Sequence, residues 1–344
     1  MAHHTVTIKD IAKKLGISKS TVSRALRDHP NVKEETKKAV TALAAALDYH
    51  PDPVARGLLN KKTYILGVIV PNLSFPYFSL AVSGMQEIAS KAGYQIMICQ
   101  SNESYETEKA VIRTLTANRV DGLILSISIE TREDAHIREL IRKKVPLVLF
   151  DRVIGDIPVP SVVMDNTDAA FRMTEHLIEQ GYRRIAHIAG PESLLVSKQR
   201  VKGYTLALRK YGLPIDPELL IYKGFRIESG KEAAEALLGL PQPPDAIMAV
   251  SDSAAAGAIM AIESRGMRVP DDIAVSGFNN EVYTSFVKPP VTTVSLPMYD
   301  LGKEAIRLLL RQISHSEEPV SFEPRVLKSS LVIRESTRRK ADTQ

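Results

Sequence analysis

Short apolar stretches alternate with longer amphipathic stretches over most of the chain after residue 62. We expect the apolar stretches to be strands, and the stretches whose apolar residues recur three and four apart to be helices. This alternation predicts parallel sheets covered by helices on both faces, arranged as two doubly wound lobes. The expected strands are 64–70, 94–99, 122–127, 146–150, 161–164, 185–189, 219–223, 246–250 and 273–277. The expected helices are 77–92, 105–118, 133–143, 167–180, 198–211, 229–239 and 251–265.

The first fifty residues instead predict three short helices. Thr7 can cap the first helix, and Gly16 ends it. Ser18 can cap a second helix over 19–26, and a third follows near 34–47. Two short helices joined through a glycine turn predict a helix-turn-helix, which places its second helix in the DNA major groove. A packed three-helix domain with no role in DNA binding has the same pattern.

The positive charge of the chain is concentrated in this N-terminal module. The net charge is +5, but residues 1–62 hold twelve Lys and Arg against six Asp and Glu, while the rest hold 33 against 34. A basic module on a nearly neutral body favours contact with a polyanion, although a solvated basic helix face has the same composition. The candidates for base contacts are Lys19, Ser20 and Arg24. The candidates for phosphate contacts are Thr7, Ser18, Thr21 and Ser23.

Two segments near the N-terminus carry a resemblance to a known family. The run TIKDIAKKLGISKSTVSRAL, followed by YHPDPVARGL, is similar to the headpiece and hinge of the LacI/GalR (lactose-repressor) family of bacterial transcription regulators. The resemblance extends over essentially the whole chain, although Lys33 and Asp52 replace the usual Ser and Asn. It implies an N-terminal all-α helix-turn-helix headpiece plus an α/β two-lobed periplasmic-binding-protein-like (type I) effector domain. The implied parts are the headpiece 1–50, the hinge 51–61, one lobe of 62–163 plus 294–324, a second lobe of 164–293 plus 325–336, and a polar tail 337–344.

The hinge of this family pairs with its dimer mate and enters the DNA minor groove. The resemblance implies that Leu58 wedges into the central base step and that Arg56 contacts the adjacent backbone or groove. A linker anchored on the body is the alternative for Leu58. The tail ESTRRKADTQ lacks the leucine heptads with which some relatives form tetramers. We therefore expect a homodimer on a pseudo-palindromic operator.

Polar and aromatic residues follow the expected strands, at the ends where such sheets bind ligands. Carboxylates and guanidinium groups can each engage two ligand oxygens, and aromatic rings offer a face to a sugar or a base. By resemblance, the positions that contact the effector in the family are matched by Asp165, Arg200, Phe225 and Asn279. The further candidates at strand ends are Phe75, Tyr77, Phe78, Asp151, Arg152 and Asp252.

Several of these candidates have a structural alternative. Phe75 fits a core position, and Asp252 fits a helix cap. Asp151 and Arg152 can form a structural pair. By resemblance, Leu194 and Val196 stand where purine-responsive members are polar, which favours a sugar or sugar derivative as the effector. The alternative is a nucleobase or another metabolite acting as corepressor. Asn279 departs from the usual Asp of the family, so this position does not favour a specific ligand.

Other function classes have less support. A single cysteine, Cys99, excludes an intramolecular disulfide and favours a reducing compartment. No apolar segment approaches the ~20 residues of a membrane span, and the start lacks an apolar signal region, so we expect a cytoplasmic protein without membrane contact. The motifs GxGxxG, HExxH and GxSxG are absent, and the histidines show no metal-ligand spacing beyond His3 and His4.

We therefore expect a regulator with no cofactor and no metal. A sugar-binding transport component would need a secretory signal and has no use for residues 1–60. An enzyme with an appended DNA-binding module would need a catalytic constellation, and none is visible in the sequence, so we expect a transcriptional regulator and not an enzyme.

Overall fold

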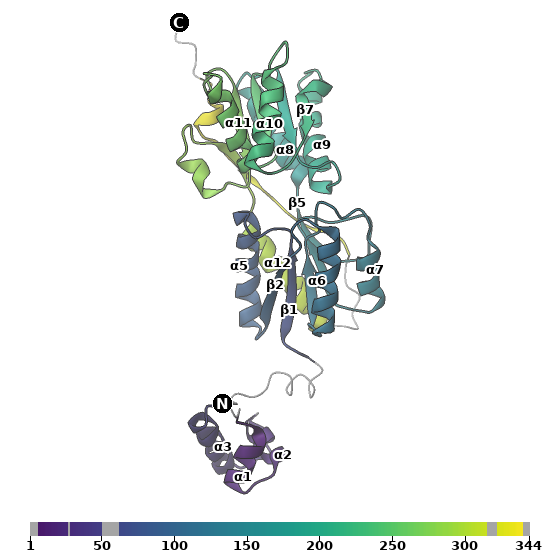
Figure 1. Cartoon of the computed structure of the whole chain (residues 1–344), viewed down its shortest axis with the longest axis vertical. Helices are drawn as coiled ribbons and strands as arrows, with labels where there is room; N and C mark the ends of the chain where they lie inside the picture. Colours follow the sequence, from purple (N-terminus) through teal and green to yellow (C-terminus); the bar gives the residue numbers. More distant parts are fainter. Residues whose placement is uncertain (1–5, 27, 50–61, 315–321, 340–344) are drawn as a thin grey trace. The chain divides into compact units, whose positions relative to one another are not determined.

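The computed structural model describes residues 6–26, 28–49, 62–314 and 322–339. The chain divides into two compact units, residues 1–64 and 65–344, and each is described by itself (Figure 1). The first unit contains the helices α1 (Ile8–Leu15), α2 (Lys19–Ala25) and α3 (Glu34–Ala46). Their shared core consists of Ile11, Ala12, Val22, Ala25, Val32, Val40 and Ala44.

The ends of these helices follow from local chemistry. The Asp10 carboxylate accepts hydrogen bonds from the backbone N–H of Thr7 at 2.8 Å and from its hydroxyl at 2.7 Å. Gly16 ends α1 with φ of 62°, a left-handed conformation that glycine adopts without a Cβ penalty. The Ser18 hydroxyl accepts from the backbone N–H of Thr21 at 3.1 Å at the start of α2. Lys33 provides no side-chain cap for α3.

The second unit consists of two lobes, each built on a six-stranded sheet. The strands are β1 (Ile65–Val70), β2 (Gln95–Gln100), β3 (Gly122–Leu125), β4 (Leu147–Phe150), β5 (Ser161–Met164), β6 (Ile185–Ala189), β7 (Leu220–Tyr222), β8 (Ala246–Ala249), β9 (Ala274–Phe278), β10 (Thr292–Ser295), β11 (Arg325–Leu327) and β12 (Ser330–Val332). The first sheet has the order β11-β5-β4-β3-β1-β2 and the second the order β12-β10-β9-β8-β6-β7. Neighbouring strands are parallel except β12, which is antiparallel to β10.

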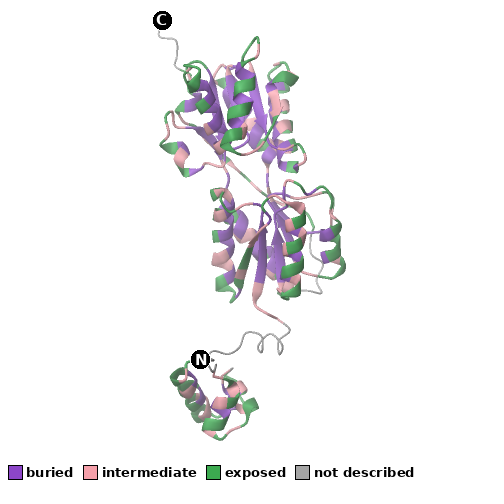
Figure 2. Cartoon of the chain, in the orientation of Figure 1, coloured by how far each residue is buried: buried purple, intermediate pink, exposed green. Residues whose placement is uncertain are grey.

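Helices cover both sheets, as the strand–helix alternation predicts. Figure 2 shows buried central strands between helices whose outer surfaces are exposed. The α-helices are α5 (Pro76–Lys91), α6 (Tyr105–Ala117), α7 (Ala135–Arg142), α8 (Asn166–Glu179), α9 (Leu195–Lys210), α10 (Ile227–Leu238), α11 (Asp252–Ser264) and α12 (Met298–Ser314). The short 3-10 helices are η1 (Pro217–Leu219), η2 (Val282–Ser285) and η3 (Glu335–Thr337).

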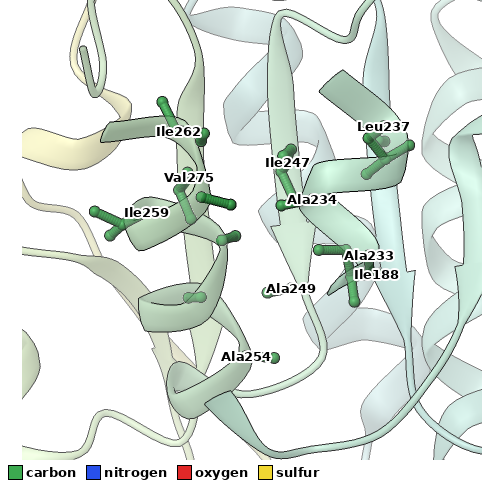
Figure 3. Close-up of a cluster of buried hydrophobic side chains, with 14 of the residues drawn as sticks. Ile188, Ala233, Ala234, Leu237, Ile247, Ala249, Ala254, Ile259, Ile262 and Val275 are labelled. Carbon is green, nitrogen blue, oxygen red and sulfur yellow. The ribbon is translucent and has the colours of Figure 1, made fainter. Parts of the chain in front are cut away.

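The core of the second lobe lies between the sheet and the pair α10 and α11 (Figure 3). Small residues let these two helices approach closely. A Cβ on Gly230 would lie 2.0 Å from the Ala254 carbonyl oxygen, and one on Gly257 would lie 2.0 Å from the Ile227 carbonyl oxygen. Glycine is therefore required at both contact points, because any side chain would force the helices apart.

The expected elements are present, with shifts of a few residues at their ends. The largest shift is at α9, which begins at Leu195 and not at 198. The lobe boundaries also differ from expectation. β10, at 292–295, belongs to the second sheet, and β11, at 325–327, belongs to the first. The chain thus crosses between the lobes after β5, after β10 and after β11. The short strands β10 and β11 could not be assigned to a sheet from their sequence pattern, because tertiary pairing decides which sheet they join.

Candidate functional site

The exposed face of α2 carries the polar residues that the sequence singles out. Lys19, Ser20 and Arg24 are exposed, while Val22 and Ala25 are buried in the core. Of the phosphate-contact candidates, Thr7 and Ser18 are exposed, whereas Thr21 and Ser23 are partly buried. The Ser18 hydroxyl lies 2.7 Å from that of Ser20 and 2.8 Å from that of Thr21. The hinge candidates Arg56 and Leu58 lie outside the described residues.

A cavity lies between the two lobes, at the carboxyl ends of the strands, and its space together with the solvent open to it measures about 470 Å³. Its first-lobe wall is formed by Phe75, Tyr77, Phe78, Asp151 and Arg152. Its second-lobe wall is formed by Val196, Arg200, Phe225, Ser251, Ser253, Asn279 and Glu281. Eight of the ten effector candidates therefore lie at one site.

On the first-lobe wall, a buried carboxyl faces the cavity. Asp151 directly follows β4 and has φ of 58°, an unusual conformation for a residue with a side chain. The Tyr77 hydroxyl donates a hydrogen bond to its carboxylate. Burial raises the pKa of Asp151, and nearby Arg152 opposes that rise. Arg152 itself forms an ion pair with Glu103 at 2.8 Å, so the two adjacent charged residues do not pair with each other.

On the second-lobe wall, Arg200 is a buried cation with incomplete hydrogen bonding. Its side chain is 4% exposed, and burial lowers the pKa of the guanidinium. Nε donates to Oδ1 of Asn166 at 2.9 Å, and Nη1 donates to the Val250 carbonyl oxygen. The Nη2 group has no hydrogen-bond partner, and no carboxylate lies within 4.0 Å, among the residues that the structure describes. Such a group can bind a ligand oxygen with two N–H donors.

Aromatic rings line both walls of the cavity. The Arg152 guanidinium carbon lies 5.5 Å from the ring centroid of Phe78 and 5.1 Å from that of Phe225, so one cation contacts rings of both lobes. Gly190 leaves room for Phe225, because a Cβ there would lie 2.9 Å from its ring. Phe75 is half-buried at the start of α5 and lines the cavity. The cavity thus combines flat apolar surfaces with a few directed polar groups.

Two candidates do not line the cavity. Asp165 caps α8, and its Oδ1 accepts from the backbone N–H of Asp168 at 2.9 Å. Asp252 is 1% exposed, and its oxygens accept from the Thr293 hydroxyl at 2.6 Å and the backbone N–H of Glu281 at 2.7 Å. Burial raises the pKa of Asp252 to about 7. Ser251, and not Asp252, is the cap of α11.

Four lining residues were not among the candidates. These are Val196, Ser251, Ser253 and Glu281. Glu281 is 8% exposed, and burial raises the pKa of its carboxyl. Its position two residues after Asn279, in the turn that follows β9, is the sequence signal that points to it.

In the described part of the chain, no three His, Cys, Asp or Glu side chains gather in a way that could hold a metal ion. Within the same ranges, none of the helices has the length and apolar character needed to span a membrane.

A helix-turn-helix unit on the same chain as a two-lobed ligand-binding body defines a ligand-responsive DNA-binding regulator. Residues 7–52 match the model of bacterial regulatory proteins of the lacI family. Residues 63–332 match the model of periplasmic binding proteins and the sugar binding domain of the LacI family.

Individual relatives give the same result. The HTH-type transcriptional repressor CytR of Escherichia coli strain K12 is 36% identical over 96% of each chain. Catabolite control protein A of Priestia megaterium is 35% identical over 97% of this chain and 99% of its own. The lac repressor dimer bound to operator and the anti-inducer ONPF aligns with a TM-score of 0.87 at 28% identity, over 96% of this chain and 99% of that one. A transcriptional regulator CelR–cellobiose complex aligns with a TM-score of 0.74 at 30% identity, over the same shares.

The chain belongs to the LacI family of bacterial DNA-binding transcriptional regulators. The resemblance and the fold class expected from the sequence are thereby confirmed.

Proposed function

We propose that this regulator represses transcription by binding a pseudo-palindromic operator as a homodimer, and that a sugar or sugar derivative in the interlobe cavity controls its affinity for DNA. The observation that carries the ligand class is the set of polar groups at the cavity wall. The Asp151 carboxylate can accept hydrogen bonds from hydroxyls, the Asn279 amide can accept from or donate to them, and the unpaired Nη2 of Arg200 adds two donors. The rings of Phe75, Phe78 and Phe225 offer faces to an apolar ligand surface.

Two relatives support the proposed class and assembly. The CelR structure contains cellobiose, a sugar, in a protein of the same fold. The lac repressor structure is a dimer on its operator. A nucleobase or nucleoside is the second candidate, because the three phenylalanine rings lie on both walls and suit a flat base.

On DNA, α2 is proposed to enter the major groove. Lys19 and Arg24 bind guanine edges and Ser20 accepts several bases, whereas Thr7, Ser18, Thr21 and Ser23 hold the phosphates. Arg56 and Leu58 are proposed to act in the minor groove at the centre of the operator.

The coupling between ligand and operator is proposed to depend on the two walls. One wall of the cavity comes from each lobe, and three crossings connect the lobes. A ligand that contacts both walls favours one relative orientation of the lobes. It changes DNA affinity only if it binds the operator-competent and operator-free states unequally.

The test begins with a footprint of the purified full-length protein on the DNA of its host, without added ligand. Discrete pseudo-palindromic sites upstream of genes for sugar uptake or breakdown support the proposal, and those genes nominate the effector. Sites upstream of nucleoside genes favour the second candidate. Failure to footprint any site, alone and with candidate metabolites, contradicts the proposal.

The second experiment places the nominated effector in the cavity. Arg200→Gln should bind operator like wild type but lose the response of that binding to effector. Arg209→Gln is the matched control, because Arg209 is exposed on the same helix and forms no ion pair among the described residues. A wild-type dose response in Arg200→Gln removes this residue from the site.

A further inference from the structure

A second hollow, separate from the interlobe cavity, lies between α6 and α7 of the first lobe. It has a volume of about 830 Å³ and shares no lining residue with the cavity. Figure 1 shows both helices on the right of this lobe, with α5 on the left. We call it the α6–α7 groove, and its lining residues are Tyr105, Lys109, Ile112, Arg113, Thr116, Ala135, His136, Glu139, Leu140, Arg142 and Lys143.

The α6–α7 groove concentrates positive charge. Four of its lining residues are cations, Lys109, Arg113, Arg142 and Lys143, and one is an anion, Glu139. Residues 63–344 as a whole carry almost equal numbers of acidic and basic side chains, so this excess is local. A local excess of one sign in a concave site raises the local concentration of ligands of opposite charge.

The two arginines of the groove lack ion-pair partners. Lys143 pairs with Glu139 at 2.7 Å, and Lys109 pairs with Glu106, which lies outside the groove, at 2.7 Å. Neither Arg113 nor Arg142 has a carboxylate within 4.0 Å among the described residues. Both nevertheless lie close enough to act on Glu139, whose pKa is lowered mainly by Lys143 and further by Arg142 and Arg113. Two guanidinium groups around one carboxylate are thus available for an added anion.

The floor of the groove is apolar except for one unsatisfied ring atom. Ile112 and Leu140 are 5% and 3% exposed. His136 is 7% exposed, and its Nε2 lies 2.8 Å from Oε1 of Glu108. Its Nδ1 is buried and has no hydrogen-bond partner among the described residues. Buried polar atoms are normally paired, so this one indicates a missing partner.

An aromatic ring closes one end of the groove. The Lys109 ammonium lies 4.4 Å from the centroid of the Tyr105 ring, and that ring meets His136 edge-on with centroids 5.2 Å apart. The groove therefore offers a flat apolar surface beside its cations.

We propose that the α6–α7 groove binds a phosphorylated small molecule that carries an apolar or ring portion. The phosphate pairs with Arg113 and Arg142, whose planar guanidinium groups match phosphate oxygens in two-point contacts. The apolar portion lies on Tyr105, Ile112 and Leu140. A compact dianion neutralises two guanidinium groups better than a single carboxylate does.

Isothermal titration of the full-length protein with phenyl phosphate and with inorganic phosphate tests this proposal. Phenyl phosphate should bind once per chain, and more tightly than inorganic phosphate by about fivefold or more, because its ring adds apolar burial. The double variant Arg113→Gln/Arg142→Gln should lose at least about tenfold in affinity. Arg209→Gln, which removes an exposed arginine from another helix, should bind like wild type.

Four results overturn the proposal. One is the absence of saturable phenyl phosphate binding. Equal affinity for phenyl phosphate and inorganic phosphate removes the role of the apolar floor. Unchanged affinity in Arg113→Gln/Arg142→Gln, or equal loss in Arg209→Gln, assigns the ligand to another site or to diffuse charge. Finally, a glutamate-rich peptide that binds through Arg113 and Arg142 where phenyl phosphate does not would assign the groove to an acidic protein segment.

Discussion

Replacing Asp252 by asparagine should make the protein less sensitive to rising pH. The wild-type carboxyl is buried beside the cavity wall, and desolvation raises its pKa from 3.8 to about 7 against the hydrogen bonds of Thr293 and Glu281 and the charge of Arg334. In the neutral form its O–H can donate to the Thr293 hydroxyl while its carbonyl oxygen accepts from the Glu281 N–H. The side-chain amide introduced by Asp252→Asn offers the same donor and acceptor, so the substitution copies the neutral state.

The magnitude follows from the shift in pKa. Between the unfolded value near 3.8 and the folded value of about 7, the folded state holds a proton that the unfolded state has released. The free energy of unfolding therefore falls as the pH rises through this window, by about 1.4 kcal/mol per pH unit. From pH 5 to pH 8 the wild type should lose about 3 kcal/mol through this group, and Asp252→Asn should lose none of it.

Urea unfolding of both proteins at pH 5, 6, 7 and 8 measures this difference. The Glu281 carboxyl is present in both proteins, and its charge helps to raise the pKa of Asp252, so Asp252→Asn removes this repulsion together with the titration of Asp252. Asp156→Asn is the control, because Asp156 is exposed and has no hydrogen bond or ion pair among the described residues. If wild type and Asp252→Asn differ by a constant amount across this range, the carboxyl is ionised throughout and the reasoning from burial is refuted.

Three further results are expected. Arg24→Gln should weaken specific operator binding by about 1–3 kcal/mol and relax the base preference at one position. Titration against operator variants measures both effects. An equal loss of affinity for all sequences would make Arg24 a phosphate contact. Gly190→Ala should weaken effector binding by about 1–3 kcal/mol. The new Cβ would lie 2.6 Å from the Ser197 hydroxyl and 2.9 Å from the Phe225 ring, so the ring has to move. An unchanged affinity in calorimetry would contradict this prediction. Burial lowers the pKa of His187 from 6.5 to about 4, so the unfolded state binds a proton at a higher pH than the folded state does. The free energy of unfolding therefore falls as the pH drops from 6.5 to about 4, by about 3 kcal/mol over the whole range. At pH values below 6.5, the urea midpoint of the wild type should fall faster than that of His187→Gln. If the two midpoints change in parallel with pH, His187 is not the group responsible.

Sequence periodicity predicted the strands up to β9 and the helices up to α11, but it did not predict α12 or the short strands β10 to β12, and it did not assign every strand to its lobe. The strands β1 to β9 are apolar runs bounded by amphipathic helices, and their positions follow from local pattern. β10 and β11 are three or four residues long, and no residue of β11 is buried. The local sequence of such short strands does not show which of the two sheets they join. The crossings between the lobes near residues 295 and 327 therefore depend on tertiary pairing.

The site shows the same division between local and tertiary information. The rule that ligands meet the carboxyl ends of parallel strands predicted Asp151, Phe225 and Asn279 at the cavity wall. The same rule selected Asp252, which also follows a strand but turns its carboxylate toward Thr293. The direction of a side chain after a strand depends on which neighbouring donors are free. For Asp252 these are the Thr293 hydroxyl of β10, about forty residues further along the chain, and the backbone N–H of Glu281 in the turn after β9.

The electrostatics of the cavity argue that its ligand completes the wall. Arg200 and Asp151 are both nearly fully buried, and burial shifts the pKa of each toward its neutral form. Burying a charge without full compensation costs several kcal/mol, and the folded chain supplies Arg200 with only part of its hydrogen bonds. In the proposed site, a ligand that donates to Asp151 and accepts from Nη2 of Arg200 would compensate both groups, and it would do so only when the first-lobe and second-lobe walls are at the right separation. The proposal therefore ties the energy of binding to the orientation of the lobes, which is the condition for a ligand to shift a conformational equilibrium.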